Sequence, residues 1–88
     1  MKLKYNFVTN EVADNIVAVA VGDDMGKFNG FIKMNETGAQ IFNFLKNDIT
    51  MEELISEMAK LYPEETFETV TETVEGFVKE LIKSGVAE

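Results

Sequence analysis

The sequence predicts an α+β fold in which a three-stranded antiparallel sheet precedes three helices, in a winged helix-turn-helix-like arrangement. Three observations predict this fold. β-branched residues gather in the first third of the chain, apolar residues recur at helical spacing after residue 35, and short connections join the segments. The 88 residues have the length of one domain, so we expect residues 1–88 to form a single unit.

Three strands are expected before residue 35. Residues 5–13 are mixed, and a turn signal follows at 14–15. The apolar run IVAVAV at 16–21 is bounded by turn residues, which indicates a buried central strand. A loop with two glycines at 23–30 then leads to the third strand, FIKM at 31–34. Short connections favour an antiparallel meander.

The first helix is expected to begin after Asn35. The Asn35 side chain can accept a hydrogen bond from a backbone N–H of the first turn, and Glu36 suits the positive helix end. These residues therefore act as a cap rather than as catalytic groups. Gly38 is unusual here, because glycine in a helix costs up to about 1 kcal/mol relative to alanine. The close approach of another backbone would explain it.

Two more helices follow. Thr50 and Glu53 match a capping box, and the second helix runs from there until Pro63 ends it. The third helix is expected to start between Pro63 and Thr66, to run to about residue 84, and to have Gly85 as its C-terminal cap. Its apolar stripe consists of Phe67, Val70, Val74, Phe77, Val78, Leu81 and Ile82.

The composition excludes several classes of function. The chain has no His, Cys, Arg or Trp, which rules out zinc sites built on thiolate or imidazole, and Ser-His or Cys-His nucleophile pairs. Residues 23–26 (DDMG) resemble a turn more than a calcium loop. We therefore expect no enzyme, no metal and no cofactor. No apolar run approaches the roughly 20 residues of a membrane span, and no signal-peptide core is present, so a cytosolic protein is expected.

The charge argues against nucleic acid as a partner. Residues 48–88 hold three lysines against eleven acids and account for the net charge of −8. In a winged helix, the second helix of the pair would face DNA, yet this helix starts with Glu52 and Glu53. Carboxylates there repel phosphate. A DNA-binding or protein–protein interaction module remains the alternative interpretation.

A second hypothesis is peptide binding at a sheet edge. An extended peptide can add to an edge strand through main-chain hydrogen bonds, with side-chain pockets supplying selectivity. If the third helix packs alongside strand 31–34, the two form a groove. Thr71, Val78 and Ile82 widen the apolar stripe of that helix sideways. The sequence alone favours the plainer interpretation that all these helix residues are core.

A resemblance to a known family supports the peptide hypothesis. The stretch FIKMNETGAQIFNFLKNDITMEELISEMAKLYP, followed by a helix with ETVEGFVKELIKSGV, resembles the PqqD-like family over about residues 5–87. The residues that carry the resemblance are, in order, Asn35, Glu36, Thr37, Gly38, Ile41, Leu45, Thr50, Glu53, Leu54, Ile55, Tyr62, Val74, Phe77, Val78, Leu81 and Gly85.

The resemblance implies a non-enzymatic chaperone of pyrroloquinoline quinone or related ribosomal-peptide (RiPP) pathways. Such a domain binds the leader of a precursor peptide as an added strand and presents it to a modifying enzyme, commonly a radical S-adenosylmethionine enzyme. The implied strand wall is Phe31, Ile32, Lys33 and Met34, and the implied helix wall is Thr71, Val74, Val78 and Leu81. We expect Val78→Asp to weaken peptide binding without unfolding the domain; unfolding would instead place Val78 in the core.

Two departures from the family pattern leave the pathway open. Thr73-Val74 stands where the family has Asp-Val, and Lys46-Asn47 stands where Asp-Gly is common. Neither departure disturbs the fold, but the product of the pathway stays undecided between pyrroloquinoline quinone and another modified peptide. The acidic third helix predicts a leader with Lys or Arg near its helix-facing side. We expect a monomer or a weak dimer, because an unpaired edge strand can pair with a second copy.

Overall fold

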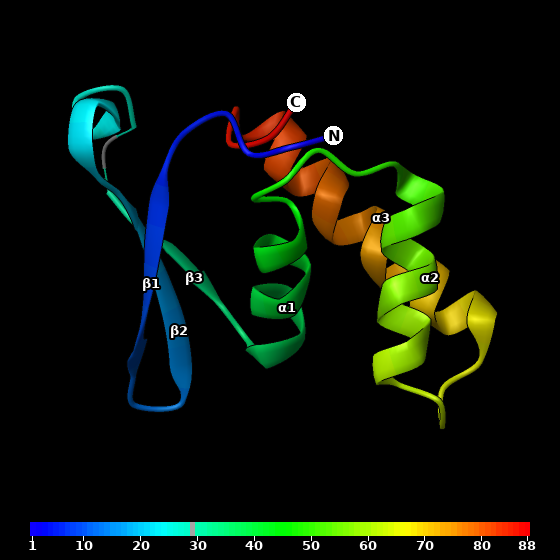
Figure 1. Cartoon of the computed structure of the whole chain (residues 1–88). Helices are drawn as coiled ribbons and strands as arrows, with labels where there is room; N and C mark the ends of the chain where they lie inside the picture. The colour runs from blue at the N-terminus through cyan, green and yellow to red at the C-terminus, as the bar shows by residue number, and fades with distance from the viewer. Residues whose placement is uncertain (29) are drawn as a thin grey trace.

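The computed structural model describes residues 1–28 and 30–88. It has three strands and then three α-helices, with a short 3-10 helix between the second and third strands (Figure 1). The elements are β1 (Phe7–Val12), β2 (Asn15–Ala20), η1 (Gly22–Asp24), β3 (Ile32–Met34), α1 (Glu36–Phe44), α2 (Met51–Leu61) and α3 (Phe67–Lys83). The predicted fold class is confirmed. The expected loop at 23–30 includes residue 29, which lies outside the described residues.

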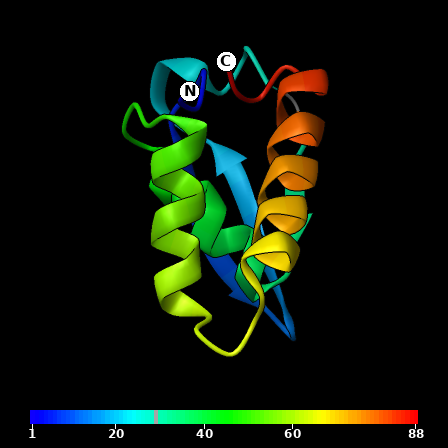
Figure 2. The same ribbon diagram turned by 90° about the vertical axis from the view of Figure 1, so that its right-hand side faces the viewer.

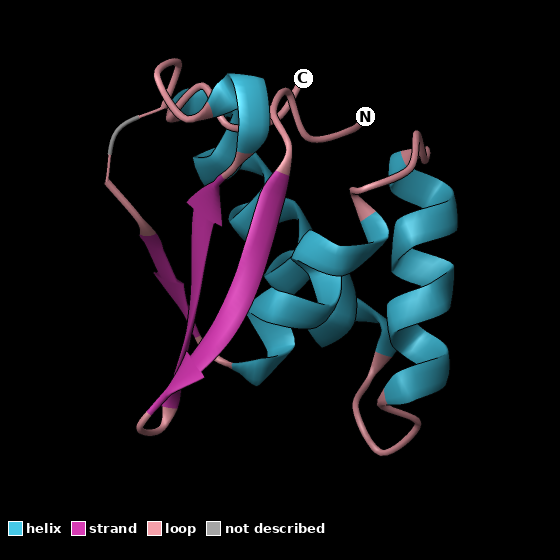
Figure 3. Ribbon diagram, turned by 60° about the vertical axis from the view of Figure 1, so that its left-hand side comes forward, coloured by secondary structure: helices cyan, strands magenta, loops and turns pink. Residues whose placement is uncertain are grey.

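The strands form one layer and the helices the other. The sheet is antiparallel in the order β1-β2-β3, so β1 and β3 are its two edges. Figure 3 shows α1, α2 and α3 on the same side of the sheet, and within residues 1–28 and 30–88 no helix covers its other face. In Figure 2, α2 and α3 stand side by side in front of α1 and the sheet.

The hairpin between β1 and β2 fixes the direction of every backbone group in the sheet. Only two residues connect the strands, and Val12 pairs with Asn15. The closing pair of a two-residue hairpin is hydrogen-bonded, and hydrogen-bonded pairs then alternate along the ladder. Odd-numbered residues of β2 therefore direct their backbone groups toward β1, and even-numbered residues direct theirs toward β3. Ala13 adopts a positive φ of 57° in the turn.

Only one face of β2 is buried. Ala18 and Ala20 face the helices and are buried, whereas Val17 and Val19 on the opposite face are half-buried. The expectation of a strand buried on both faces is therefore wrong for the outer face. A continuous apolar run cannot distinguish a two-sided core from a sheet with one bare face.

The first two helices begin at the predicted caps, and the third begins at a cap that is not among those predicted. The Asn35 side chain accepts from the Gly38 N–H at 2.8 Å, and Thr50 and Glu53 form both hydrogen bonds of a capping box. Thr66 caps α3 by accepting from Thr69, and Gly85 takes a φ of 78° just after the helix. Each cap satisfies backbone groups that the ends of a helix leave without partners.

The core lies between the sheet and the helices, and the two chain ends close one side of it. Its largest fully buried side chains are Phe42, Ile41, Leu45, Leu54, Met58, Val74, Val78 and Val86. Leu3 pairs with Ala87 in an antiparallel bridge, and the Lys4 N–H donates to the Val86 carbonyl at 2.8 Å. The ends therefore lie together at the top of Figure 1.

Candidate functional site

The open edge of β3 is the first component of the candidate site. Ile32 pairs with Ala18 and Met34 pairs with Ile16. Both partners are even-numbered residues of β2, so these are the hydrogen-bonded pairs of the ladder. The N–H and C=O of Lys33 therefore point away from the sheet. Within the described residues, no main-chain hydrogen bond satisfies them.

The four predicted strand residues lie on two different faces. Ile32 and Met34 face the helices; Met34 is buried and Ile32 is half-buried. Lys33 and Phe31 lie on the outer face, where Phe31 is 63% exposed. Strand alternation separates the two pairs. The edge therefore offers Ile32 on the helical side and the Lys33 backbone in the middle, whereas the Phe31 side chain is turned away from the helices.

One flank of α3 approaches the junction between β3 and α1. A Cβ atom at Gly38 would meet Cε1 of Phe77 at 2.8 Å, so the ring lies directly against the start of α1. Thr69 and Thr73, on the same flank of α3, line a cavity together with Asn35. In Figure 2, β3 is seen behind α3.

The predicted helix wall lies mostly in the core. Val74 and Val78 have no exposed surface, and Leu81 is 5% exposed. Thr71 is half-buried and lies about 120° around the helix from Phe77, at 100° per residue. Its hydroxyl oxygen is buried without a hydrogen-bond partner among the described residues. Three of these four side chains are therefore core residues and the fourth lies on another flank of the helix, so their contact with a peptide stays a prediction.

Two other residues of α3, Thr73 and Phe77, lie beside the start of α1. Thr73 is exposed and Phe77 is half-buried, so both present surface on the flank nearest to β3. The sequence pattern places Phe77 in the apolar stripe of α3, and it marks Thr73 only as a departure from the family pattern. Gly38 is the feature of the sequence that indicates this contact, because a glycine inside a helix suggests that another group packs closely against it. The expected close approach at Gly38 exists, but its partner is the ring of Phe77 rather than another backbone.

A cavity of about 240 Å³ opens where this flank meets the junction of β3 and α1. Tyr62 stands at one side, where its hydroxyl lies 3.0 Å from Thr37 Oγ1 and donates to Gln40. The lining combines apolar floor residues with hydroxyl groups and one carboxylate: Asn35, Thr37, Met58, Tyr62, Glu65, Thr69, Val70, Thr73 and Val74. Such a mixture suits one side chain with an apolar body and a polar tip.

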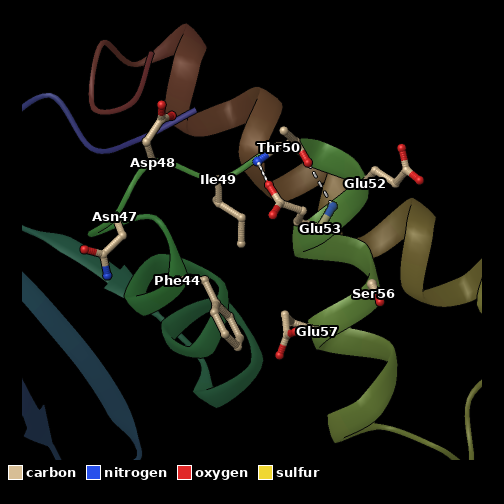
Figure 4. A pocket seen from close by; sticks show the side chains of 9 residues that line it. All are labelled: Phe44, Asn47, Asp48, Ile49, Thr50, Glu52, Glu53, Ser56 and Glu57. Atoms are coloured by element: carbon tan, nitrogen blue, oxygen red, sulfur yellow. Dashed lines mark hydrogen bonds between the residues drawn. The ribbon is translucent and has the colours of Figure 1, made fainter.

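A larger depression, of about 710 Å³, lies between α1 and the start of α2 (Figure 4). Two of its four carboxylates, Asp48 and Glu53, have structural partners at the α1–α2 turn. Glu53 closes the capping box by accepting a hydrogen bond from the Thr50 backbone N–H. This hydrogen bond lowers the pKa of Glu53. Asp48 accepts from the amino terminus at 2.9 Å, and this ammonium group lowers the pKa of Asp48. These acids stabilise the α1–α2 turn and are not arranged around a ligand.

The described residues offer no other chemical centre. They contain no group of three or more His, Cys, Asp or Glu side chains placed to hold a metal ion. None of the described helices is long and apolar enough to cross a membrane. The β3 edge, the Thr73–Phe77 flank and the adjoining cavity are therefore the candidate site.

Comparisons with known proteins give the fold and the family of the chain. No curated protein matches the chain. Among solved structures, the chain is similar to "TbiB1 in Complex with the TbiA(beta) Leader Peptide", with a TM-score of 0.74, 18% sequence identity, and coverage of 100% of this chain and 95% of that one. At this identity the similarity supports the fold. The family model described as coenzyme PQQ synthesis protein D (PqqD) matches residues 9–87. The chain therefore belongs to the PqqD family.

Proposed function

We propose that this protein binds the leader segment of a ribosomally made precursor peptide as a fourth strand beside β3. The observation that carries the proposal is the outward-facing backbone of Lys33, next to the Thr73–Phe77 flank. A guest strand accepts from the Lys33 N–H and donates to its carbonyl, each bond contributing about 0.5–1.5 kcal/mol. Family membership supports the proposal, and so does the fold shared with a chain solved together with a leader peptide.

Each predicted residue has a defined place in this proposal. Lys33 pairs with the guest backbone, and Ile32 contacts guest side chains on the helical side. Phe31 extends the edge before β3. Met34, Val74, Val78 and Leu81 support the site from the core, because their side chains are buried. Thr71 has no direct contact, and Thr73 and Phe77 replace it as the helix surface.

The cavity beside Asn35 is proposed to anchor one leader side chain. A strand that pairs with Lys33 continues past Met34 toward this cavity, since both adjoin the end of β3. An aromatic or long side chain with a polar tip fits the apolar floor and the hydroxyl rim. Backbone pairing tolerates different leaders, and such an anchor fixes the register of the added strand.

The wider role that we propose is delivery, without catalysis by this chain. The bound leader is presented to a peptide-modifying enzyme, of which a radical S-adenosylmethionine enzyme is the expected kind, in the cytosol. Ordering a disordered leader costs free energy, which holds affinity at a moderate level that suits handover. The charges of α2 oppose the alternative of DNA binding, because Glu52 and Glu53 are exposed in its first turn.

Titration with N-methylated peptides tests strand addition directly. The probe is a synthetic leader encoded by the short reading frame nearest to this gene, with one N-methyl group moved along it. An N-methyl group at a residue that donates to the sheet edge removes a hydrogen bond, and we expect about a 10-fold or larger loss of affinity there. The losses should recur at every second residue. A uniform loss, or none, contradicts strand addition.

Paired variants of α3 test the helix surface. Phe77→Ala removes a ring on the β3-facing flank, and we expect about a 10-fold loss of leader affinity. Ile82→Ala is the control, because Ile82 is 47% exposed and lies on the far flank of the apolar stripe. Calorimetric titration well below the unfolding temperature separates binding from stability. If both variants change leader affinity equally, the β3-facing flank of α3 does not contact the leader.

A further inference from the structure

The outer face of the sheet is apolar, and no element of the described chain covers it. By strand alternation it carries Val8, Val12, Val17, Val19, Phe31 and Lys33, together with two asparagines. Val8 is 43% exposed, Val12 is 58% exposed and Phe31 is 63% exposed. A shallow depression of about 430 Å³ opens between Val12, Val17 and Phe31. Contiguous apolar surface of this kind usually marks a contact with another molecule.

The net negative charge of the protein lies on the helical side of the sheet. All of the net charge of −8 comes from residues 48–88, which form α2, α3 and their connections. These helices lie across the sheet from the outer face (Figure 3). Among the strand residues of the outer face, Lys33 is the one charged side chain. Contact through the helices of two copies would bring carboxylates together, whereas contact through the sheets would not.

We propose that two copies of this chain associate through the outer faces of their sheets. Stacked sheets lie about 10 Å apart, so two sheets with a helical layer outside each place the acidic layers about 30 Å from one another. That distance is several times the Debye length of about 8 Å at physiological ionic strength. Repulsion between the acidic halves is therefore largely screened, while the valines and Phe31 of both copies leave water.

The dimer differs from the edge pairing expected from the sequence. Face-to-face contact uses side chains of the outer face and leaves the Lys33 backbone at each β3 edge open. A dimer of this kind retains two sites for guest strands. The proposal does not depend on leader binding, and its test uses the protein alone.

Sedimentation equilibrium of the full chain tests the proposal. The weight-average mass should rise from 9.9 kDa toward twice that value as the concentration increases from about 10 μM to about 1 mM. Association should strengthen between about 0.15 M and about 1 M salt, because added salt screens the net negative charge. A mass that stays at the monomer value throughout, or association that salt weakens, overturns the proposal.

Two phenylalanine variants locate the contact. Phe31→Lys places a charge in the outer face, and we expect at least about a 10-fold increase in the dissociation constant. Phe67→Lys is the matched control, because Phe67 is 67% exposed at the start of α3 and the variant has the same net charge. We expect unchanged association for that control. If Phe67→Lys disrupts association as much as Phe31→Lys, the face-to-face dimer is wrong.

Discussion

The ring of Phe77 lies against Gly38, so close that a Cβ atom at residue 38 would come within 2.8 Å of its Cε1 and 3.1 Å of its Cζ. This contact joins the first turn of α1 to the middle of α3. Because α1 begins directly after β3, the same contact determines which flank of α3 is nearest to the open sheet edge. The glycine that looked costly in a helix is required by the packing of the candidate site.

Gly38→Ala tests this contact. A methyl group there displaces the Phe77 ring, and overpacking of this kind costs about 1–3 kcal/mol of unfolding free energy. Leader affinity should fall as well, because the displaced ring belongs to the proposed site. Gly76→Ala is the control: no atom lies within 4 Å of a Cβ at Gly76, so the better helix propensity of alanine should stabilise α3 by about 0.5–1 kcal/mol. Urea unfolding measures both changes, and a stabilised Gly38→Ala would contradict the packing role.

Val78→Asp should unfold the protein rather than only weaken binding. The family resemblance implied a peptide contact for Val78, but its side chain has no exposed surface. An uncompensated carboxylate at such a site costs about 3–5 kcal/mol or more, which is a large part of the stability of a small domain. Lys79→Asp also introduces a carboxylate, at an exposed neighbouring position, and should keep the fold. Far-ultraviolet circular dichroism shows whether each variant is folded. A folded Val78→Asp variant would contradict the core position of Val78.

These outcomes show which features the sequence could reveal. The caps at Asn35 and Thr50 depend on side chains that bond to backbone groups within three residues, so a local pattern predicts them. The flank of α3 is different. Thr71 and Thr73 both border the apolar stripe, and no local signal says which one faces β3. Packing between distant segments decides this, as it also does for the pairing of Leu3 with Ala87.

The outer face of the sheet illustrates a second limit of the sequence. The residues of β2 are apolar on both faces, so their pattern predicts a strand covered on both sides. The three helices that follow all pack on one side, which leaves Val17 and Val19 without a covering layer. The number of layers depends on how the helices pack on one another, and the strand itself does not encode it.

Asp24 should give the stability a pH dependence at acidic pH. Its carboxylate accepts from the Asn6 backbone N–H at 2.8 Å and lies 3.3 Å from the Lys27 ammonium. The hydrogen bond from Asn6 is the main cause that lowers the pKa of Asp24 below its usual value. Because the folded-state pKa is the lower one, this stabilisation is present above about pH 4 and is lost as the pH falls through the folded-state pKa.

Asp24→Asn should therefore remove part of the acid sensitivity. Urea midpoints of the variant and the parent should differ more near neutral pH than near pH 3, where Asp24 is protonated in the unfolded chain. Asp23→Asn is the control, since Asp23 makes no hydrogen bond or ion pair with the rest of the described chain. The prediction is wrong if the urea midpoints of Asp24→Asn and the parent differ by the same amount at both pH values.

Leader binding should weaken as salt increases, because α3 presents a carboxylate beside the proposed site. Glu80 lies on the same flank as Thr73 and Phe77, at spacings of seven and three residues, and its side chain is exposed. A Lys or Arg of the leader placed there gains at most about 1 kcal/mol, so affinity should fall a few-fold between about 0.05 M and about 0.5 M salt. Glu80→Gln should flatten this dependence. Glu75→Gln, about 140° around α3 from Glu80, should retain it. Affinity that is independent of salt in the parent would show that the leader makes no ionic contact with α3, and the apolar and backbone contacts would then account for binding.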